Sequence, residues 1–467
     1  MRILMVGAGM VGLCAGMLLA DDGHDVTVVE RDPAPPPDPG DAWSGWERRG
    51  VNQFRLPNFL LSRFRLTAEA ELPRLIQALT EAGACRYNMI ENIPDSLTGG
   101  ARPDDDRFDL LTGRRPVVEA ATARVAEATP RLTVRRGAAV RSLLVGPSDL
   151  PGTPHVTGVE LERGERLEAD LVVDASGRRS PLPKWIVEAG GRPPHEELED
   201  SGFKYFARHF RSGDGLPVVL GPLVQEYGSV SALTLPADDG TWSVSLVTSS
   251  RDTALRGLAD PDRWRAAVKS LPAAAHWIDA EPLDDRMTVI TRIEDRIRDY
   301  APGGVPVATG VLAVGDSWSC TNPSLGRGAS VGLLHAVLLR DVLRDASGDE
   351  PGPLASRWWE ATRTEVEPWY RTTLNYDRHR LAQVHAEIEG APYATDDQAW
   401  NLTRSLQARS LRDGDLLRAN LDTAMLLRPT AEVLADPAIR PRLNDAGPAR
   451  VSLASRPTRD ELLTAIR

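Results

Sequence analysis

Cysteine and lysine are both scarce in this chain of 467 residues. The three cysteines, Cys14, Cys85 and Cys320, lie far apart and show no C-x-x-C spacing. This pattern excludes a zinc ribbon and a disulfide framework, so we predict no metal site and expect a cytoplasmic protein. Because so few residues are lysine, arginine carries nearly all of the positive charge.

The chain also has no excess of basic residues over acidic ones. The chain has 55 Lys and Arg against 66 Asp and Glu, a formal net charge of -11. Nucleic acid and anionic membranes are therefore poor candidates for the main partner. With 42% hydrophobic and 26% charged residues, the composition is that of a folded globular chain, and its length predicts two or three lobes.

Residues 3–20 form an uncharged stretch about as long as a membrane span or a signal sequence. Gly7, Gly9 and Gly12 interrupt it with G-x-G-x-x-G spacing, directly after an apolar strand. Such glycines make a tight turn, let the backbone approach a pyrophosphate and let a helix pack closely on a strand. We therefore predict a dinucleotide site and no membrane span.

The elements around these glycines form one βαβ unit, with a strand at 2–6, a helix at 10–20 and a strand at 25–30. The phosphates would lie at the helix N-terminus, where unpaired N–H groups favour an anion. Glu30 ends the second strand and is placed to accept hydrogen bonds from the adenosine ribose.

The rest of the chain alternates between helical and strand-like patterns. Helices are predicted at 68–84 and 116–128, and the chain is predicted to be helical beyond Leu343. Strands are predicted at 132–135, 156–161, 167–173, 203–210, 229–235 and 241–247. The last three alternate in polarity, which predicts an antiparallel sheet with one face in solvent.

Two further motifs follow. Residues 167–180 read as a strand running into a tight turn, and residues 310–334 as a strand, Gly315-Asp316, a loop with Asn322-Pro323 and a helix. With these motifs the chain resembles the flavoprotein monooxygenases of the para-hydroxybenzoate hydroxylase type, related to alkene epoxidases, geranylgeranyl reductases and flavin-dependent halogenases. The motifs span residues 3–345, about three quarters of the chain.

The resemblance implies an α/β fold, in which a Rossmann-like FAD-binding domain carries an inserted antiparallel β-sheet substrate domain and a helical C-terminal region. We place the first part of the FAD-binding domain at 1–184 and the substrate domain at 185–295. The second part of the FAD-binding domain is expected at 296–345, and the helical region at 346–467.

The resemblance also implies a non-covalently bound FAD. Asp316 would accept hydrogen bonds from the ribityl hydroxyls, and the helix starting near Ala329 would direct its dipole at the flavin ring. Arg115 is the preferred arginine contact, with Arg114 as the alternative. The complete set of expected cofactor contacts is Gly7, Gly9, Met10, Val11, Gly12, Glu30, Arg31, Arg115, Asp174, Gly177, Gly315, Asp316, Pro323, Gly326, Gly328 and Ala329.

Two departures from the family pattern bear on the chemistry. Ser176-Gly177 stands where the hydroxylases have Asp-Gly, so electrons would come from NADH or NADPH either directly or through a separate flavin reductase. The halogenases need a lysine near the flavin and a W-x-W-x-I-P signature. This chain has no lysine before Lys184 and reads WSVSLV at 242–247, which argues against halogenation.

The resemblance favours an FAD-dependent oxidoreductase, a monooxygenase that hydroxylates or epoxidises a mostly apolar small molecule in specialised metabolism. The candidate pocket residues are Tyr205, Phe206, His209, Trp242 and Pro323. The aromatic members could equally pack between sheet and helices. A reductase or dehydrogenase similar to the geranylgeranyl reductases, and a flavoprotein that binds without turnover, remain alternatives.

Overall fold

A five-stranded parallel sheet forms the centre of the first lobe. The computed structural model describes residues 1–48, 50–51, 53–346, 350–444 and 457–467. The strands, in spatial order, are β19 (Val311–Ala313), β10 (Leu171–Asp174), β1 (Arg2–Val6), β2 (Asp25–Glu30) and β6 (Leu132–Arg136). The apolar side chains of β1 and β10 are buried, as expected for central parallel strands.

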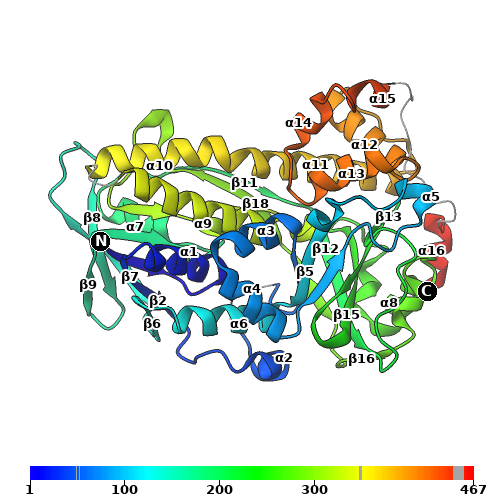
Figure 1. Ribbon diagram of the computed structural model, residues 1–467, viewed down its shortest axis with the longest axis horizontal. Helices are drawn as coiled ribbons and strands as arrows, with labels where there is room; N and C mark the ends of the chain where they lie inside the picture. Colours follow the sequence, from blue (N-terminus) through cyan, green and yellow to red (C-terminus); the bar gives the residue numbers. More distant parts are fainter. Residues whose placement is uncertain (49, 52, 347–349, 445–456) are drawn as a thin grey trace.

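Helices pack around this sheet (Figure 1). The predicted βαβ unit is present, because α1 follows β1 and contacts both α6 and α9. The helices of this lobe are α1 (Met10–Asp21), α3 (Ser62–Glu71), α4 (Pro73–Glu81), α6 (Arg115–Glu127), α7 (Leu182–Glu188) and α9 (Gly328–Asp345). A small antiparallel sheet of β7 (Val140–Gly146), β8 (His155–Leu161) and β9 (Arg166–Glu168) contacts the central sheet through β8 and β10.

The second lobe contains a six-stranded antiparallel sheet. Its strands are β13 (Val224–Tyr227), β14 (Val230–Pro236), β15 (Thr241–Ser249), β12 (Phe203–Arg211), β16 (Glu281–Pro282) and β17 (Thr288–Ile290). The expectation of a solvent-exposed face is wrong, because all nine residues of β15 are buried. Helix α8 (Pro261–Lys269) covers one face, with the Trp264 indole N–H donating to the Phe206 carbonyl at 3.0 Å.

Two three-stranded sheets lie beside these larger sheets and carry residues of the site described below. One consists of β3 (Pro57–Leu60), β5 (Asp109–Arg114) and β4 (Cys85–Asn88). The other consists of β11 (His195–Asp200), β18 (Glu294–Asp299) and β20 (Ser319–Cys320). Two short helices, α2 (Ala42–Gly45) and α5 (Asp95–Thr98), lie in the connections.

The C-terminal part is helical, as predicted. Helices α10 (Pro351–Glu365) and α11 (Glu367–Ile388) run along one side of the molecule, and α10 packs on α9 (Figure 1). The following helices are α12 (Gln398–Ser410), α13 (Gly414–Ala424), α14 (Thr430–Ala435) and α15 (Arg440–Asn444). Helix α16 (Arg459–Ala465) contacts α8, and its Leu462 lies in the core of the antiparallel lobe. Within the described residues, no helix is both long and apolar enough to cross a bilayer.

Two sequence expectations joined elements that the structure separates. The helix expected at 68–84 is interrupted at Leu72, which leaves helical geometry immediately before Pro73. Proline disfavours the α conformation in the preceding residue, and α4 begins at the proline itself. The strand expected at 167–173 is divided between β9 and β10, which belong to different sheets.

Candidate functional site

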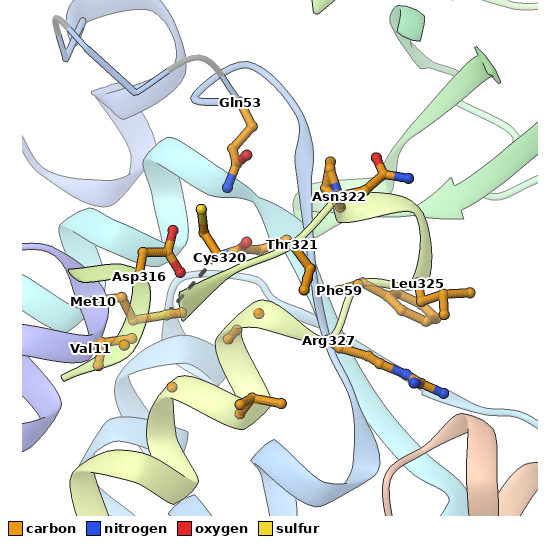
Figure 2. A pocket seen from close by; sticks show the side chains of 18 of the residues that line it. Met10, Val11, Gln53, Phe59, Asp316, Cys320, Thr321, Asn322, Leu325 and Arg327 are labelled. Carbon is orange, nitrogen blue, oxygen red and sulfur yellow. Dashed lines mark hydrogen bonds between the residues drawn. The ribbon is translucent and has the colours of Figure 1, made fainter. Parts of the chain in front are cut away.

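A long pocket opens between the glycine turn after β1, the start of α9 and the antiparallel sheet (Figure 2). Its lining comes from parts of the chain that are far apart in sequence, between residues 9 and 373, which the topology brings together. Of the expected contacts, the lining includes Gly9, Met10, Val11, Gly12, Arg115, Gly177, Gly315, Asp316, Pro323, Gly326, Gly328 and Ala329. Gly7, Glu30, Arg31 and Asp174 are not part of the lining.

The three glycines after β1 differ in what surrounds them. Gly7 has a φ of +104°, and a Cβ there would come within 2.7 Å of the Ala175 carbonyl oxygen. A Cβ on Gly12 would come within 2.4 Å of the Gly7 carbonyl oxygen. A Cβ on Gly9 would meet nothing within 4 Å and would enter the pocket. The turn is therefore closed around Gly7 and Gly12, and it leaves open space at the position where a pyrophosphate approaches the backbone.

Glu30 is buried at the end of β2 and already has protein partners. Its carboxylate accepts hydrogen bonds from the Ala8 and Asp32 amides, at 2.9 and 3.0 Å. It also pairs with the Arg48 guanidinium at 2.9 Å. Glu119 pairs with Arg48 as well, at 2.7 Å. Burial opposes the charge on Arg48, but these carboxylates outweigh it and raise its pKa.

The two candidate arginines are placed differently. Arg115 lines the pocket and donates from Nε to Glu119 at 2.6 Å. Arg114 is buried and held by Asp238, whose carboxylate accepts from its backbone amide at 2.5 Å and from its Nε at 3.0 Å. Arg114 is therefore committed to a structural ion pair, whereas Arg115 contributes a cation to the pocket wall.

Asp316 lies in the pocket wall with no hydrogen-bond or ion-pair partner among the described residues. Burial raises the pKa of its carboxyl group, and the charges of Arg115 and Arg178 oppose that shift. Figure 2 shows the carboxylate beside Met10 and Cys320. A half-buried acceptor with no donor among the described residues suits a ligand that brings hydroxyl groups.

His335 fixes the backbone beside Asp316, and sequence reasoning missed it. The Gly315 amide donates to His335 Nδ1 at 3.1 Å, and the ring stacks on Trp358 with centroids 4.7 Å apart. Burial lowers the pKa of His335 to about 3, so the ring is neutral and its Nε2 hydrogen is directed at the Thr362 hydroxyl, 3.1 Å away. An isolated histidine within an apolar helix pattern gave no signal for this role.

Asp174 supports the turn from behind the pocket wall. It accepts hydrogen bonds from the Ser176 amide, at 3.0 Å, and from the Ser180 hydroxyl. Burial raises the pKa of this carboxyl, and the hydrogen bonds oppose the shift. The next pocket residue, Gly177, donates its N–H to the Ser317 hydroxyl at 2.9 Å. This hydrogen bond joins the motif at residues 167–180 directly to the motif at residues 310–334.

The loop before α9 contributes backbone to the pocket. Gly326 has a φ of +65°, and a Cβ there would press on Phe59 at 3.1 Å. Gly328 opens α9, and a Cβ there would meet nothing within 4 Å. No side chain caps this helix, so the N–H groups of Gly328 and Ala329 are available at the pocket wall. Such an N-terminus favours negative charge on a ligand.

Only some of the expected substrate-pocket residues line the pocket. Tyr205 and Pro323 line the pocket, and the Tyr205 hydroxyl donates to Asn322 Oδ1 at 2.6 Å. Phe206 and Trp242 belong to the apolar core of the antiparallel lobe. Side chains alternate along a strand, which directs Phe206 to the opposite face from Tyr205.

His209 shares a face with Tyr205 but lies four residues further along β12. It packs against Trp43, with ring centroids 4.5 Å apart, and is absent from the pocket lining. Burial lowers its pKa to about 3, and the nearby arginines add to that shift. His209 is therefore a neutral, buried ring, which does not suit it to act as a base in this pocket.

These features fit an FAD. The open position at Gly9 suits the pyrophosphate, the unpartnered Asp316 carboxylate suits ribityl hydroxyls, and the free N-terminus of α9 suits the polar edge of the ring. The fit rests on two segments that are far apart in sequence, the turn at Gly9 and residues 316–329, and that meet at one pocket.

Two family models match parts of the chain. A model described as an NAD(P)-binding Rossmann-like domain matches residues 5–57, and one described as tryptophan halogenase matches residues 118–204. The first match covers the glycine turn and β2, and the second runs from α6 to the start of β12.

Two curated proteins are similar over most of the chain. "Protein Rv3254" of Mycobacterium tuberculosis is 29% identical over 424 residues, which are 83% of this chain and 82% of that protein. Kynurenine 3-monooxygenase of Myxococcus xanthus is 23% identical over 392 residues, covering 80% of this chain and 75% of that protein.

Solved structures share the fold at low sequence identity. A mutant of P. aeruginosa PqsL superposes with a TM-score of 0.61 at 16% identity, covering 82% of this chain and 96% of that one. The Diels-Alderase PyrE3 gives 0.60 at 17% identity, with coverages of 91% and 80%. A mutant of the flavin-dependent brominase Bmp2 gives 0.59 at 14% identity, with coverages of 95% and 97%. The fold class and the family resemblance expected from the sequence are confirmed.

Proposed function

We propose that this FAD-dependent oxidoreductase, which has the fold of the FAD-dependent monooxygenases, is itself a monooxygenase that hydroxylates or epoxidises a mostly apolar organic substrate. The observation that carries the proposal is the continuity of the pocket. The wall that holds Gly9 and Asp316 continues into an apolar wall of Leu56, Phe59 and Leu235. A mostly apolar pocket beside the cofactor site is what oxygen transfer to an organic substrate requires.

The chain's own residues would bind and orient the reacting groups. FAD, when bound, would supply the redox chemistry and the reaction with O2. Gly9 would leave room for the pyrophosphate, and Asp316 would hold the ribityl chain. The free N–H groups at the start of α9 would stabilise negative charge on the reduced ring. Tyr205 and Pro323 would bound the space for the substrate.

Two solved neighbours suggest the kind of substrate. PqsL has been solved in complex with 2-aminobenzoylacetate, with a TM-score of 0.57 to this chain. Another neighbour is named as an oxygenase of 2-methyl-3-hydroxypyridine-5-carboxylic acid, with a TM-score of 0.53. Both compounds are aromatic and carry a carboxylate, so we propose small aromatic acids as the first compounds to test.

Halogenation is disfavoured in spite of the tryptophan halogenase match. The halogenases need a lysine near the flavin, and the pocket lining contains none among the described residues. The matched segment, residues 118–204, supplies mostly FAD-domain elements of this fold. The match therefore supports a flavin fold and gives no evidence of a halogenating lysine.

Labelled oxygen tests the proposal. The pure protein, supplied with FAD, a flavin reductase and NADH, would be incubated with aromatic acids under ¹⁸O₂, and the products analysed by mass spectrometry. We expect a product that contains one ¹⁸O atom, and a lower yield of it with Asp316→Ala when FAD is limiting. A reduced product without label would identify a reductase instead, and binding without any product would identify a non-catalytic binder.

A further inference from the structure

Arg327 lies between the two glycines of the loop and lines the pocket. Figure 2 shows its side chain running alongside Phe59 and Leu325 and pointing away from Asp316. Trp369 and Thr373 of α11 also line the pocket, and Thr373 contacts the guanidinium. The guanidinium therefore points away from Asp316 and lies near apolar side chains of the pocket wall.

The fold leaves this guanidinium largely unpaired. Within the described part of the chain, its one hydrogen bond runs from Nη1 to the Thr373 hydroxyl, at 3.0 Å, and its buried Nε has no partner there. Among the described residues, no carboxylate lies within ion-pair distance of it. Two buried arginines elsewhere in the chain have such partners: Arg114 pairs with Asp238, and Arg418 with Asp105 at 2.6 Å. Arg327 is half-buried, its loss of solvent is costly without an anion, and burial lowers its pKa to about 10.

The nearest acid does not neutralise Arg327. Asp377 lies one turn after Thr373 on α11, and its Oδ1 accepts from the Ser324 hydroxyl at 2.9 Å. Its buried Oδ2 has no hydrogen-bond partner in the part of the chain that the structure describes. Burial, and then the neighbouring charge of Asp295, raise the pKa of Asp377 to about 8. This carboxyl is therefore mostly protonated at neutral pH, and the charge of Arg327 stays uncompensated.

We propose that Arg327 binds the carboxylate of the substrate. An apolar or aromatic body would lie against Phe59 and Trp369, and the acid group would pair with the guanidinium, whose planar array of donors matches a carboxylate. The inference rests on the proposed function and assigns a binding residue to the carboxylate of its small aromatic acids.

A matched pair of probes tests the proposal without turnover. 2-Aminobenzoate and 2-aminobenzamide share a ring and differ in charge, and calorimetry would measure the binding of each to the oxidised, flavin-loaded protein. We expect the acid to bind about 10- to 100-fold more tightly than the amide, as for a charged hydrogen-bonded contact. Arg327→Gln should remove that preference while leaving the affinity for the amide unchanged.

The controls separate this role from others. Arg344→Gln makes the same change at a half-exposed position of the same helix and should keep the preference. Arg327→Lys keeps the positive charge and should retain part of the preference for the acid. This variant also tests the proposal if the glutamine variant fails to fold. Because binding is measured without O2 or reductant, the result does not depend on whether labelled oxygen is incorporated.

Several outcomes would overturn the proposal. The wild-type protein could bind the acid and the amide equally, or bind neither. Arg327→Gln could keep the full preference for the acid. Finally, Arg327→Gln could change the reduction potential of the flavin without changing the preference, which would assign the guanidinium to the cofactor.

Discussion

Asp316 and Arg327 are charged side chains that line one pocket, and neither has an ion-pair partner among the described residues. Their surroundings differ: Arg327 extends past Phe59, whereas Asp316 lies beside the glycine turn (Figure 2). A protein rarely buries charge without compensation unless a ligand provides it. Each residue therefore yields a separate test.

Replacing Asp316 should weaken cofactor binding. Asp316→Ala removes the acceptor that we assign to the ribityl hydroxyls, and we expect a loss of about 1–3 kcal/mol in FAD affinity. Asp316→Asn keeps an oxygen acceptor and should lose less. Fluorescence titration of apoprotein with FAD measures both variants. If Asp316→Ala binds FAD as tightly as the wild type, the carboxylate has no such role.

Asp377→Asn should have a higher free energy of unfolding than the wild type, and the difference should increase with pH. The folded chain keeps a proton on Asp377 up to about pH 8, whereas the unfolded chain releases it near pH 4, so this group's contribution to stability falls across that window. Asparagine stays neutral and can accept the Ser324 and Asn322 hydrogen bonds. The groups facing it are Asp295 on β18, Tyr205 on β12 and Arg327.

Denaturant unfolding at about pH 6 and about pH 8 provides the measurement for this variant. Asp377→Asn should exceed the wild type by a margin that grows by roughly 1 kcal/mol or more between the two conditions. Asp285→Asn, at an exposed position, should show no such growth. A constant margin would mean that Asp377 is ionised throughout.

The position of a residue at the pocket could be predicted where it follows from a motif. Gly9, Gly12 and Asp316 line the pocket as expected, because backbone approach and hydroxyl binding need those residue types at fixed spacing. Arg48, His335 and Asp377 were missed. Each acts through partners from distant segments, such as Glu119 for Arg48 and Gly315 for His335, and a single sequence does not show those pairings.

At the scale of elements, the turn between β1 and α1 allows a paired test. Gly9→Ala should fold normally, because its added Cβ enters open space, but FAD affinity should fall about tenfold or more as the methyl meets the pyrophosphate. Gly12→Ala should cost about 1–3 kcal/mol of stability, because its Cβ would press on the Gly7 carbonyl oxygen. Thermal unfolding of the apoproteins and FAD titration separate the two effects. Normal FAD binding by Gly9→Ala would show that the pyrophosphate lies elsewhere.

Helices and strands with a strong hydrophobic periodicity were predicted well. Their ends and their exposed faces were predicted less well. The βαβ unit and the strands of the antiparallel sheet lie where the pattern placed them. The prediction of a solvent-exposed face on the antiparallel sheet was wrong because α8 and other segments cover the sheet. Alternation in sequence does not reveal what packs on a face. Pro73 divided a helix whose apolar stripe continues across the break, with Leu72, Leu75 and Leu79 all buried.

At the scale of the whole molecule, Ser176 bears on how the bound flavin receives its electrons. Ser176 is neutral and shorter than the aspartate that the hydroxylases carry, and its backbone amide is held by Asp174. We therefore expect slow reduction of the bound flavin by NADH or NADPH alone, and rapid reduction when a flavin reductase is added. Anaerobic mixing with the absorbance of oxidised flavin as readout measures this. Rapid bleaching by the pure protein would contradict a two-component system.

The identity and stoichiometry of the bound flavin test the central claim most directly. Purified protein reconstituted with a mixture of FAD and FMN would be desalted and precipitated with acid, and the flavin in the supernatant quantified by chromatography. We predict one FAD per chain, released to the supernatant, and a large loss of bound flavin in Gly9→Ala at matched concentration. Preferential retention of FMN, flavin left in the pellet, or no retained flavin would contradict the assignment of this pocket to a non-covalent FAD.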